Sequence, residues 1–335
     1  MDHTETSIQK DLIATLENLC PANMSLADIL ADLLDISKDS AYRRIRCETL
    51  LNIDELLEVS KYFKISIDNI LNIRSNSVVF DYNSIKNIED YKQYLRSIIH
   101  DLKELSKFDD VKVIYAAQDI PLFHNFRFAR LARFKLFYWL RSIVNAEEFQ
   151  DKKFSDGDID EELVSLGAEL YDAYSRVPSD EIWTEISPVS LFKQVEFCWS
   201  SGLFESQEQA LEVCNDVEEE FTDLEQQARS GIKNTTEGKP SGFKKNFNLY
   251  LSEIEIGNNC IFTRRGDNKM VYLAYNTFNK ITTTNQPFGE EINIWLLNLM
   301  RKSTPISEVS EKHRYQFFKK LHKGLEDVRE KIMRD

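Results

Sequence analysis

A chain of 335 residues exceeds one domain of ordinary size, so we expect at least two domains. Hydrophobic residues make up 42% of it, which is enough for packed cores and excludes wholesale disorder. The formal net charge of −14 excludes a protein that coats nucleic acid without sequence selection, because such binding depends on neutralising phosphates.

Other bulk features predict a cytoplasmic protein. No run of about 18 apolar residues is present, so neither a transmembrane helix nor a membrane partner is expected. The N-terminal sequence MDHTETSIQK lacks the layout of a signal peptide. The five cysteines are widely spread without a C-x-x-C pair, as is typical of reduced thiols.

The first 74 residues predict five short helices. Apolar residues at helical spacing predict the first over 6–19. Ser25 with Asp28 forms a capping box for the second helix, and Ser37 caps a third over 37–46 after a three-residue break. A second capping box opens a fourth helix at Asn52, and a final helix is predicted over 66–71. Tight connections between short helices are the helix-turn-helix layout.

The run LADLLDIS at 30–37, followed by SAYRRIR at 40–46, resembles the phage-repressor (Cro-type, XRE-like) helix-turn-helix family. In that family an "LA" helix precedes a G-V/I-S turn and a recognition helix, and 50–71 is similar to its fourth and fifth helices. The match covers about residues 20–72. Asp35 and Cys47 stand where the family usually has glycine. Asp adopts a left-handed conformation at modest cost, whereas Cys47 predicts a slightly different exit from the helix.

The resemblance implies a DNA-binding face on the third helix. Ala41 and Ile45 should face inward, and N-terminal residues of such a helix contact base edges in the major groove. We expect base or near-base contacts from Lys38, Asp39, Tyr42 and Arg43, with Ser37 at the helix start. We expect phosphate contacts from Ser25, Arg44, Arg46 and Thr49.

Charge leaves two functions open. Residues 1–75 hold 8 basic and 13 acidic side chains, a net −5, although four bases and one acid lie between Lys38 and Arg46. A focused positive edge on an acidic body suits selective DNA binding. The alternative is a protein–protein interaction module whose helical head no longer binds DNA, which the acidic charge and the two missing glycines favour. Carboxylates that interrupt the basic edge would support that alternative.

Residues 75–107 predict a linker and a helix with a heptad-like apolar seam between Ile88 and Leu105. This helix either forms a dimer or packs on its own domain. Residues 108–335 predict a helix-rich α+β regulatory or oligomerisation domain with a small sheet. Its expected strands lie at 111–117, 247–256, 260–264 and 269–275, with a hairpin turn at 265–268.

The same region predicts helices over 158–228, 290–301 and 310–333, and a mobile loop over 229–245. Residues 123–144 combine aromatic with basic side chains, and the aromatics fall on most faces of the helix. This pattern favours a buried core helix with arginines along its flank over a nucleic-acid or membrane surface.

No pattern for chemistry is evident. The phosphate-binding, dinucleotide-binding and nucleophile-elbow motifs are missing, and the five histidines are far apart. We therefore expect no enzyme, no metal and no cofactor. The sequence as a whole predicts a mostly α transcriptional regulator. Its expected partners are double-stranded DNA, a second copy of the chain in a homodimer, and an unknown small-molecule or protein effector.

Overall fold

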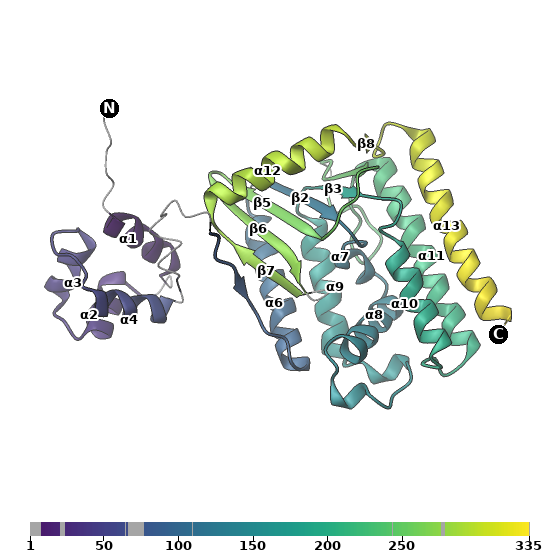
Figure 1. Cartoon of the computed structure of the whole chain (residues 1–335), viewed down its shortest axis with the longest axis horizontal. Helices are drawn as coiled ribbons and strands as arrows, with labels where there is room; N and C mark the ends of the chain where they lie inside the picture. Colours follow the sequence, from purple (N-terminus) through teal and green to yellow (C-terminus); the bar gives the residue numbers. More distant parts are fainter. Residues whose placement is uncertain are drawn as a thin grey trace. The chain divides into compact units, whose positions relative to one another are not determined.

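The computed structural model describes residues 8–20, 24–63, 65, 77–108, 110–242, 244–275 and 279–334. Contacts within the chain divide it into two units, Met1–Val79 and Phe80–Asp335 (Figure 1). The described residues are mostly helical, with a mixed sheet in the second unit. No helix among them is long and apolar enough to cross a membrane.

The first unit contains four described helices: α1 (Ile8–Leu19), α2 (Leu26–Leu34), α3 (Lys38–Ile45) and α4 (Ile53–Phe63). They enclose a small core in which Leu16, Leu30, Ala41 and Val59 are fully buried. The first four predicted helices are confirmed. The predicted fifth helix at 66–71 lies outside the described residues.

The second unit is built on a mixed sheet in the order β1-β7-β6-β5-β2-β3-β4-β8. Strands β2, β3 and β4 pair in parallel, and the other pairs are antiparallel. The strands are β1 (Asp81–Tyr82), β2 (Val111–Ala117), β3 (Ser179–Trp183), β4 (Phe247–Leu251), β5 (Cys260–Arg265), β6 (Asn268–Tyr275), β7 (Asn279–Thr283) and β8 (Thr304–Pro305).

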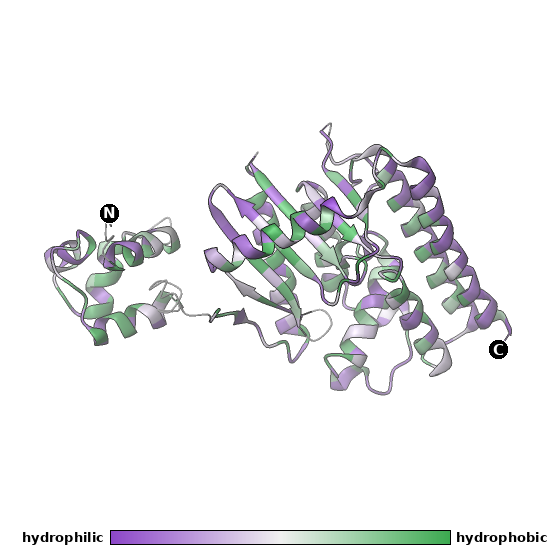
Figure 2. Ribbon diagram, turned by 45° about the horizontal axis from the view of Figure 1, so that its top comes forward, coloured by the Kyte–Doolittle hydropathy of each residue, from purple (hydrophilic) through white to green (hydrophobic). Residues whose placement is uncertain are grey.

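Helices cover both faces of this sheet. Helix α12 lies across one face, where Leu296 packs with Ile114 and Phe262. The remaining long helices pack on the opposite face, against Val113 and Tyr115 of the same β2 strand, because successive strand residues point to opposite faces. Figures 1 and 2 show this layering and the hydrophobic interior of the unit. The helices are α6 (Ile88–Leu105), α7 (Leu122–Asn125), α8 (Ala129–Ser142), α9 (Glu161–Ser175), α10 (Val189–Ser200), α11 (Gln207–Ser230), α12 (Gln286–Arg301) and α13 (Glu311–Arg334).

The heptad-like seam is part of the core of the second unit. Tyr91, Leu95, Ile98 and Leu102 of α6 are buried there, in the main cluster of the helical layer. Of the two interpretations, the amphipathic helix packed on its own domain is therefore the one that the structure shows. The second unit begins at Phe80 and includes α6.

The aromatic and basic segment forms α7 and α8, and its interpretation as a core helix is confirmed. Phe134 and Phe137 are fully buried. The flanking arginines are used within the unit: Arg130 pairs with Asp156 at 3.3 Å, and Arg133 donates to Glu161 at 2.6 Å.

Two expectations for the second unit are corrected. The sheet is larger than predicted, because β1, β3, β7 and β8 were not recognised. The segment 229–245 was expected to be a mobile loop, yet Lys233 is fully buried in it. Its ammonium group donates to the Val177 carbonyl at 2.6 Å and lies 3.8 Å from the Tyr174 ring centre. Satisfying this buried charge ties the segment to the core.

Candidate nucleic-acid interface

Helices α2 and α3 are joined by a turn that three side chains shape. Ser25 accepts the Asp28 amide at 3.1 Å and caps α2, and Ser37 accepts the Ser40 amide at 3.2 Å and caps α3. Between them, Asp35 has the left-handed conformation (φ 50°, ψ 51°), and the Ile36 amide donates back to the Ala31 carbonyl at 3.0 Å. This is a Schellman-type helix end.

Helix α3 ends in the same way. Cys47 has φ 61°, its amide donates to Arg44 at 3.0 Å, and the Glu48 amide donates to the Arg43 carbonyl at 2.8 Å. Both positions at which glycine is usual in the resembled family therefore have the backbone conformation that favours glycine. The departure at these positions is in residue type, and the different helix exit expected from Cys47 is not seen.

The expected orientation of α3 is confirmed. Ala41 is fully buried and Ile45 packs against the core, while Lys38, Asp39 and Arg43 are exposed and Tyr42 is 48% exposed. The flanking candidates are also exposed: Ser25, Ser37, Arg46 and Thr49. Eight of the nine candidate residues thus lie on the surface of the first unit.

Arg44 is the one candidate residue that is not exposed. Its guanidinium donates to both Glu55 carboxylate oxygens, at 3.0 and 2.6 Å, and to the Ser40 carbonyl at 3.2 Å. The Arg44 and Glu55 side chains are only 14% and 15% exposed. The hydrogen bond from Arg44 lowers the pKa of Glu55. This geometry does not fit the expected phosphate contact, because the guanidinium already joins α3 to α4 through a bidentate pair.

Two residues that the sequence did not identify hold α3 and the segment after it in place. Glu55 was recognised only as a capping residue of α4. Gln9 of α1 donates to the Arg44 and Thr49 carbonyls, each at 2.8 Å, and accepts the Leu51 amide at 2.8 Å. One buried carboxamide therefore fixes the segment after α3. A polar residue among the apolar positions of the first predicted helix was the available signal.

We expect Glu55→Ala to destabilise the first unit by about 2 kcal/mol, because it leaves a mostly buried arginine without its partner. Native-state hydrogen exchange of the α3 and α4 amides measures the change. Glu48→Ala is the matched control, since Glu48 pairs with Arg46 at 2.8 Å but is 52% exposed. Equal effects of the two substitutions would contradict the structural role of the Arg44–Glu55 pair.

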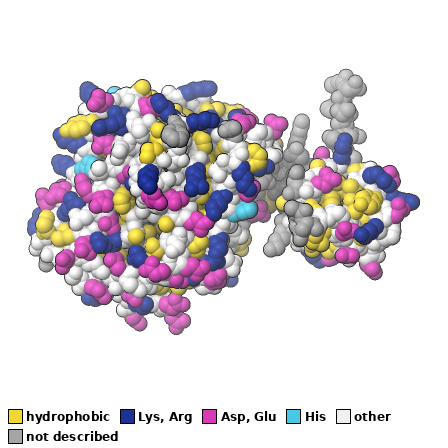
Figure 3. Space-filling view, turned by 180° about the vertical axis from the view of Figure 1, so that it is seen from behind, with side chains coloured by type: hydrophobic (Ala, Val, Ile, Leu, Met, Phe, Trp, Pro, Cys, Tyr) yellow, Lys and Arg dark blue, Asp and Glu magenta, His cyan; other side chains and the backbone are white. Residues whose placement is uncertain are grey.

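The exposed basic side chains each have a carboxylate neighbour. Lys38 contacts Asp28 at 2.6 Å, and Arg43 contacts Asp39 at 3.1 Å. With the Arg46–Glu48 pair, these contacts interrupt the basic edge, and Figure 3 shows acidic and basic side chains interspersed on the surface of each unit. Exposed pairs of this kind contribute little to stability, so a phosphate can replace the carboxylate.

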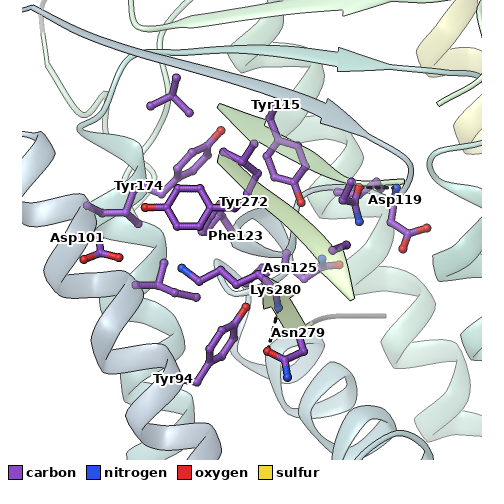
Figure 4. A pocket seen from close by; sticks show the side chains of 18 of the residues that line it. Tyr94, Asp101, Tyr115, Asp119, Phe123, Asn125, Tyr174, Tyr272, Asn279 and Lys280 are labelled. Atoms are coloured by element: carbon purple, nitrogen blue, oxygen red, sulfur yellow. Dashed lines mark hydrogen bonds between the residues drawn. The ribbon is translucent and has the colours of Figure 1, made fainter. Parts of the chain in front are cut away.

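The second unit contributes a cavity that the sequence did not indicate. It lies between α6 and the strands β2, β5, β6 and β7, with a volume of about 100 Å³. The part of the chain that the structure describes contains no group of three metal-ligating side chains. Figure 4 shows aromatic, basic and acidic side chains meeting in the cavity.

A buried polar cluster adjoins this cavity and shares Tyr174 with its lining. Glu181 of β3 contacts the His124 imidazole at 3.0 Å, accepts from the Trp183 indole at 2.9 Å and is bonded to the Tyr174 hydroxyl. Burial acts to raise the pKa of Glu181, but the charge and hydrogen bond of His124 outweigh it and lower the pKa. These hydrogen bonds join Glu181 to three buried side chains, while Nδ1 of His124 has no hydrogen-bond partner among the described residues.

No protein-family model, curated protein or solved structure matches this chain.

Proposed function

We propose that the protein is a sequence-specific DNA-binding transcriptional regulator that inserts α3 into the major groove. The observation that carries the proposal is the α2–turn–α3 unit, with serine caps at both helices and left-handed Asp35 and Cys47 at both ends. This unit presents Lys38, Tyr42 and Arg43 to solvent on the face opposite its core. Such a face is what a recognition helix requires.

The proposal includes a homodimer on a two-fold symmetric operator. Helix-turn-helix dimers place their recognition helices about one turn of DNA apart, so symmetry in the protein is mirrored in the site. The second unit would set the spacing of two heads and respond to an effector.

A selection from genomic fragments tests the proposal. The full-length protein is incubated with fragments at low and moderate salt, beside an Arg43→Ala variant. Enrichment of one motif with two-fold symmetry, lost in the variant, is expected. If no motif is enriched at either salt concentration, the isolated protein does not bind DNA sequence-specifically.

One observation favours the second candidate, a protein-interaction module. All three exposed bases of the edge have a carboxylate partner in the free protein. If this pairing had replaced DNA binding, the selection would enrich nothing, and pull-downs from a lysate would be the next experiment.

If the protein binds DNA, these carboxylates oppose binding. We expect the double variant Asp28→Asn with Glu48→Gln to bind the selected motif about two- to fivefold more tightly per removed charge at low salt. In this variant Lys38 and Arg46 can bind phosphates without first breaking an ion pair with Asp28 or Glu48. Fluorescence anisotropy with a labelled duplex measures the affinity. Glu58→Gln is the control, since Glu58 pairs with Lys61 on α4. Unchanged affinity in the double variant would show that this edge does not face phosphates.

A further inference from the structure

The cavity of the second unit has an apolar lining with a few charged groups. Its walls include Tyr94 of α6, Tyr115 of β2, Phe123 of α7 and Tyr272 of β6. At about 100 Å³ it is smaller than the cavity of about 150 Å³ that holds benzene. The cavity is partly open to solvent, so a small ligand can enter it without being wholly enclosed.

Two opposite charges face this cavity without an ionic partner. The Lys280 ammonium lies 4.3 Å from the Tyr272 ring centre and 5.8 Å from that of Tyr94. Asp101 projects from α6 toward the same space, as Figure 4 shows. Among the described residues neither side chain forms an ion pair, although the two charges act on each other and His100 acts on Asp101.

Burial leaves both charges poorly solvated. It lowers the pKa of Lys280 to about 8 and raises the pKa of Asp101, although each group partly offsets the shift of the other. A partly buried ammonium and carboxylate that are close but not in contact are each under-satisfied. A molecule that bridges them would satisfy both.

The side chain of Asn125 also indicates that the cavity binds a ligand. Asn125, at the end of α7, is 1% exposed and lines the cavity. Its carboxamide oxygen has no hydrogen-bond partner in the described part of the chain. Buried side-chain acceptors are nearly always paired, so an unpaired one that lines a cavity indicates a donor on a bound molecule.

Other polar side chains of the lining already have partners. Lys135 donates to Gln194 at 2.7 Å, the Asn259 oxygen accepts the Gln118 amide at 2.7 Å, and Asn279 donates to the Asn83 carbonyl at 2.8 Å. Asp119 also lines the cavity, where burial raises its pKa and the charge of Lys135 and a hydrogen bond with Ser190 oppose that rise. Besides these groups, Lys280, Asp101 and Asn125 offer a ligand one cation, one anion and one neutral acceptor.

We propose that this cavity binds a small aliphatic α-amino acid. Its carboxylate would pair with Lys280, its ammonium group with Asp101, and its side chain would lie against the aromatic walls. A zwitterion is complementary to the two charges, whereas a ligand with a single charge would leave the other one buried and unpaired. The proposal goes beyond DNA binding and does not depend on it, and it assigns the effector a site and a chemical class.

Titration calorimetry on the full chain, without DNA, tests this site with three matched probes. L-valine carries both charges, isovalerate lacks the ammonium group, and isobutylamine lacks the carboxylate. We expect valine to bind at least tenfold more tightly than either analogue, because each analogue leaves one buried charge unpaired. Equal binding of isovalerate or isobutylamine would overturn the zwitterion assignment. So would the failure of valine, alanine and leucine to bind at up to about 10 mM.

Two substitutions locate the binding event. Lys280→Met and Asp101→Asn should each weaken valine binding at least tenfold, while Lys302→Met on the exposed end of α12 should leave it unchanged. Valine binding that survives both cavity substitutions would place the ligand elsewhere and overturn the proposal. If a substituted chain does not fold, the three probes on the unsubstituted protein still decide it. Because no DNA is present, the result is independent of the genomic selection.

Discussion

Replacing Glu220 with glutamine is expected to stabilise the second unit by about 3 kcal/mol at pH 8 and to have little effect below pH 4.5. Glu220 of α11 is 1% exposed, and neither of its carboxylate oxygens has a hydrogen-bond partner among the described residues. Burial raises its pKa from 4.5 to about 7, despite the opposing charges of His124, Lys135 and Arg127.

Glu220→Gln stabilises the protein at high pH because Glu220 ionises more easily in the unfolded state than in the folded one. In the unfolded state the carboxyl ionises at its ordinary pKa, whereas in the folded protein it stays protonated to about pH 7. The stability that protonated Glu220 contributes to the folded protein is fully present below pH 4.5 and is lost as the pH rises through 7. Glutamine is neutral throughout, so the variant does not lose this stability.

Urea unfolding followed by tryptophan fluorescence measures the effect, since all four tryptophans lie in the second unit. Glu219→Gln is the matched control, because Glu219 is the exposed neighbour on the same helix. Stability curves of Glu220→Gln and the unsubstituted protein that run parallel from pH 4 to 8 would show that the Glu220 carboxylate is satisfied when ionised.

Arg43→Ala is expected to lower the affinity for the selected motif by about 10- to 100-fold and to relax the sequence preference at one base pair. Arg43 is exposed in the last turn of α3, and among the described residues its ionic partner is the exposed Asp39, so its guanidinium can turn to a guanine edge. Anisotropy titrations against the motif and its single-base variants measure both quantities.

Arg46→Ala provides the contrast. A phosphate contact carries no sequence information, so its loss should weaken binding to all duplexes alike and reduce the salt dependence by about one counterion. If Arg43→Ala also weakens binding uniformly, then Arg43 contacts the backbone and another residue of α3 reads the sequence.

Local patterns in the sequence were sufficient for much of the fold. Ser25 and Ser37 marked two helix starts because a capping oxygen acts on an amide only three residues away. The β5–β6 hairpin was recognisable because two apolar runs flank a short polar turn at 265–268. Strand β3 was not recognised, since Asp180 and Glu181 interrupt its apolar pattern and Glu181 is buried only with the help of His124.

The surface of α3 and the cavity of the second unit depend more than the helices and strands do on contacts between residues that are distant in the sequence. The exposed face of α3 followed from helical periodicity, but the Arg44–Glu55 pair depends on how α3 packs against α4. Lys280, Asp101 and Asn125 come from three separate elements that only the folded sheet brings together. The spacing of these three residues in the sequence therefore does not predict that they lie close together.

Dimethyl sulfate protection on the selected motif reports which groove α3 occupies, because the reagent methylates guanine N7 in the major groove and adenine N3 in the minor groove. We predict that the protein protects guanine N7 in two half-sites about one helical turn apart, and that Arg43→Ala restores reactivity at one guanine in each. Protection confined to adenine N3, or unchanged by Arg43→Ala, would contradict the insertion of α3 into the major groove.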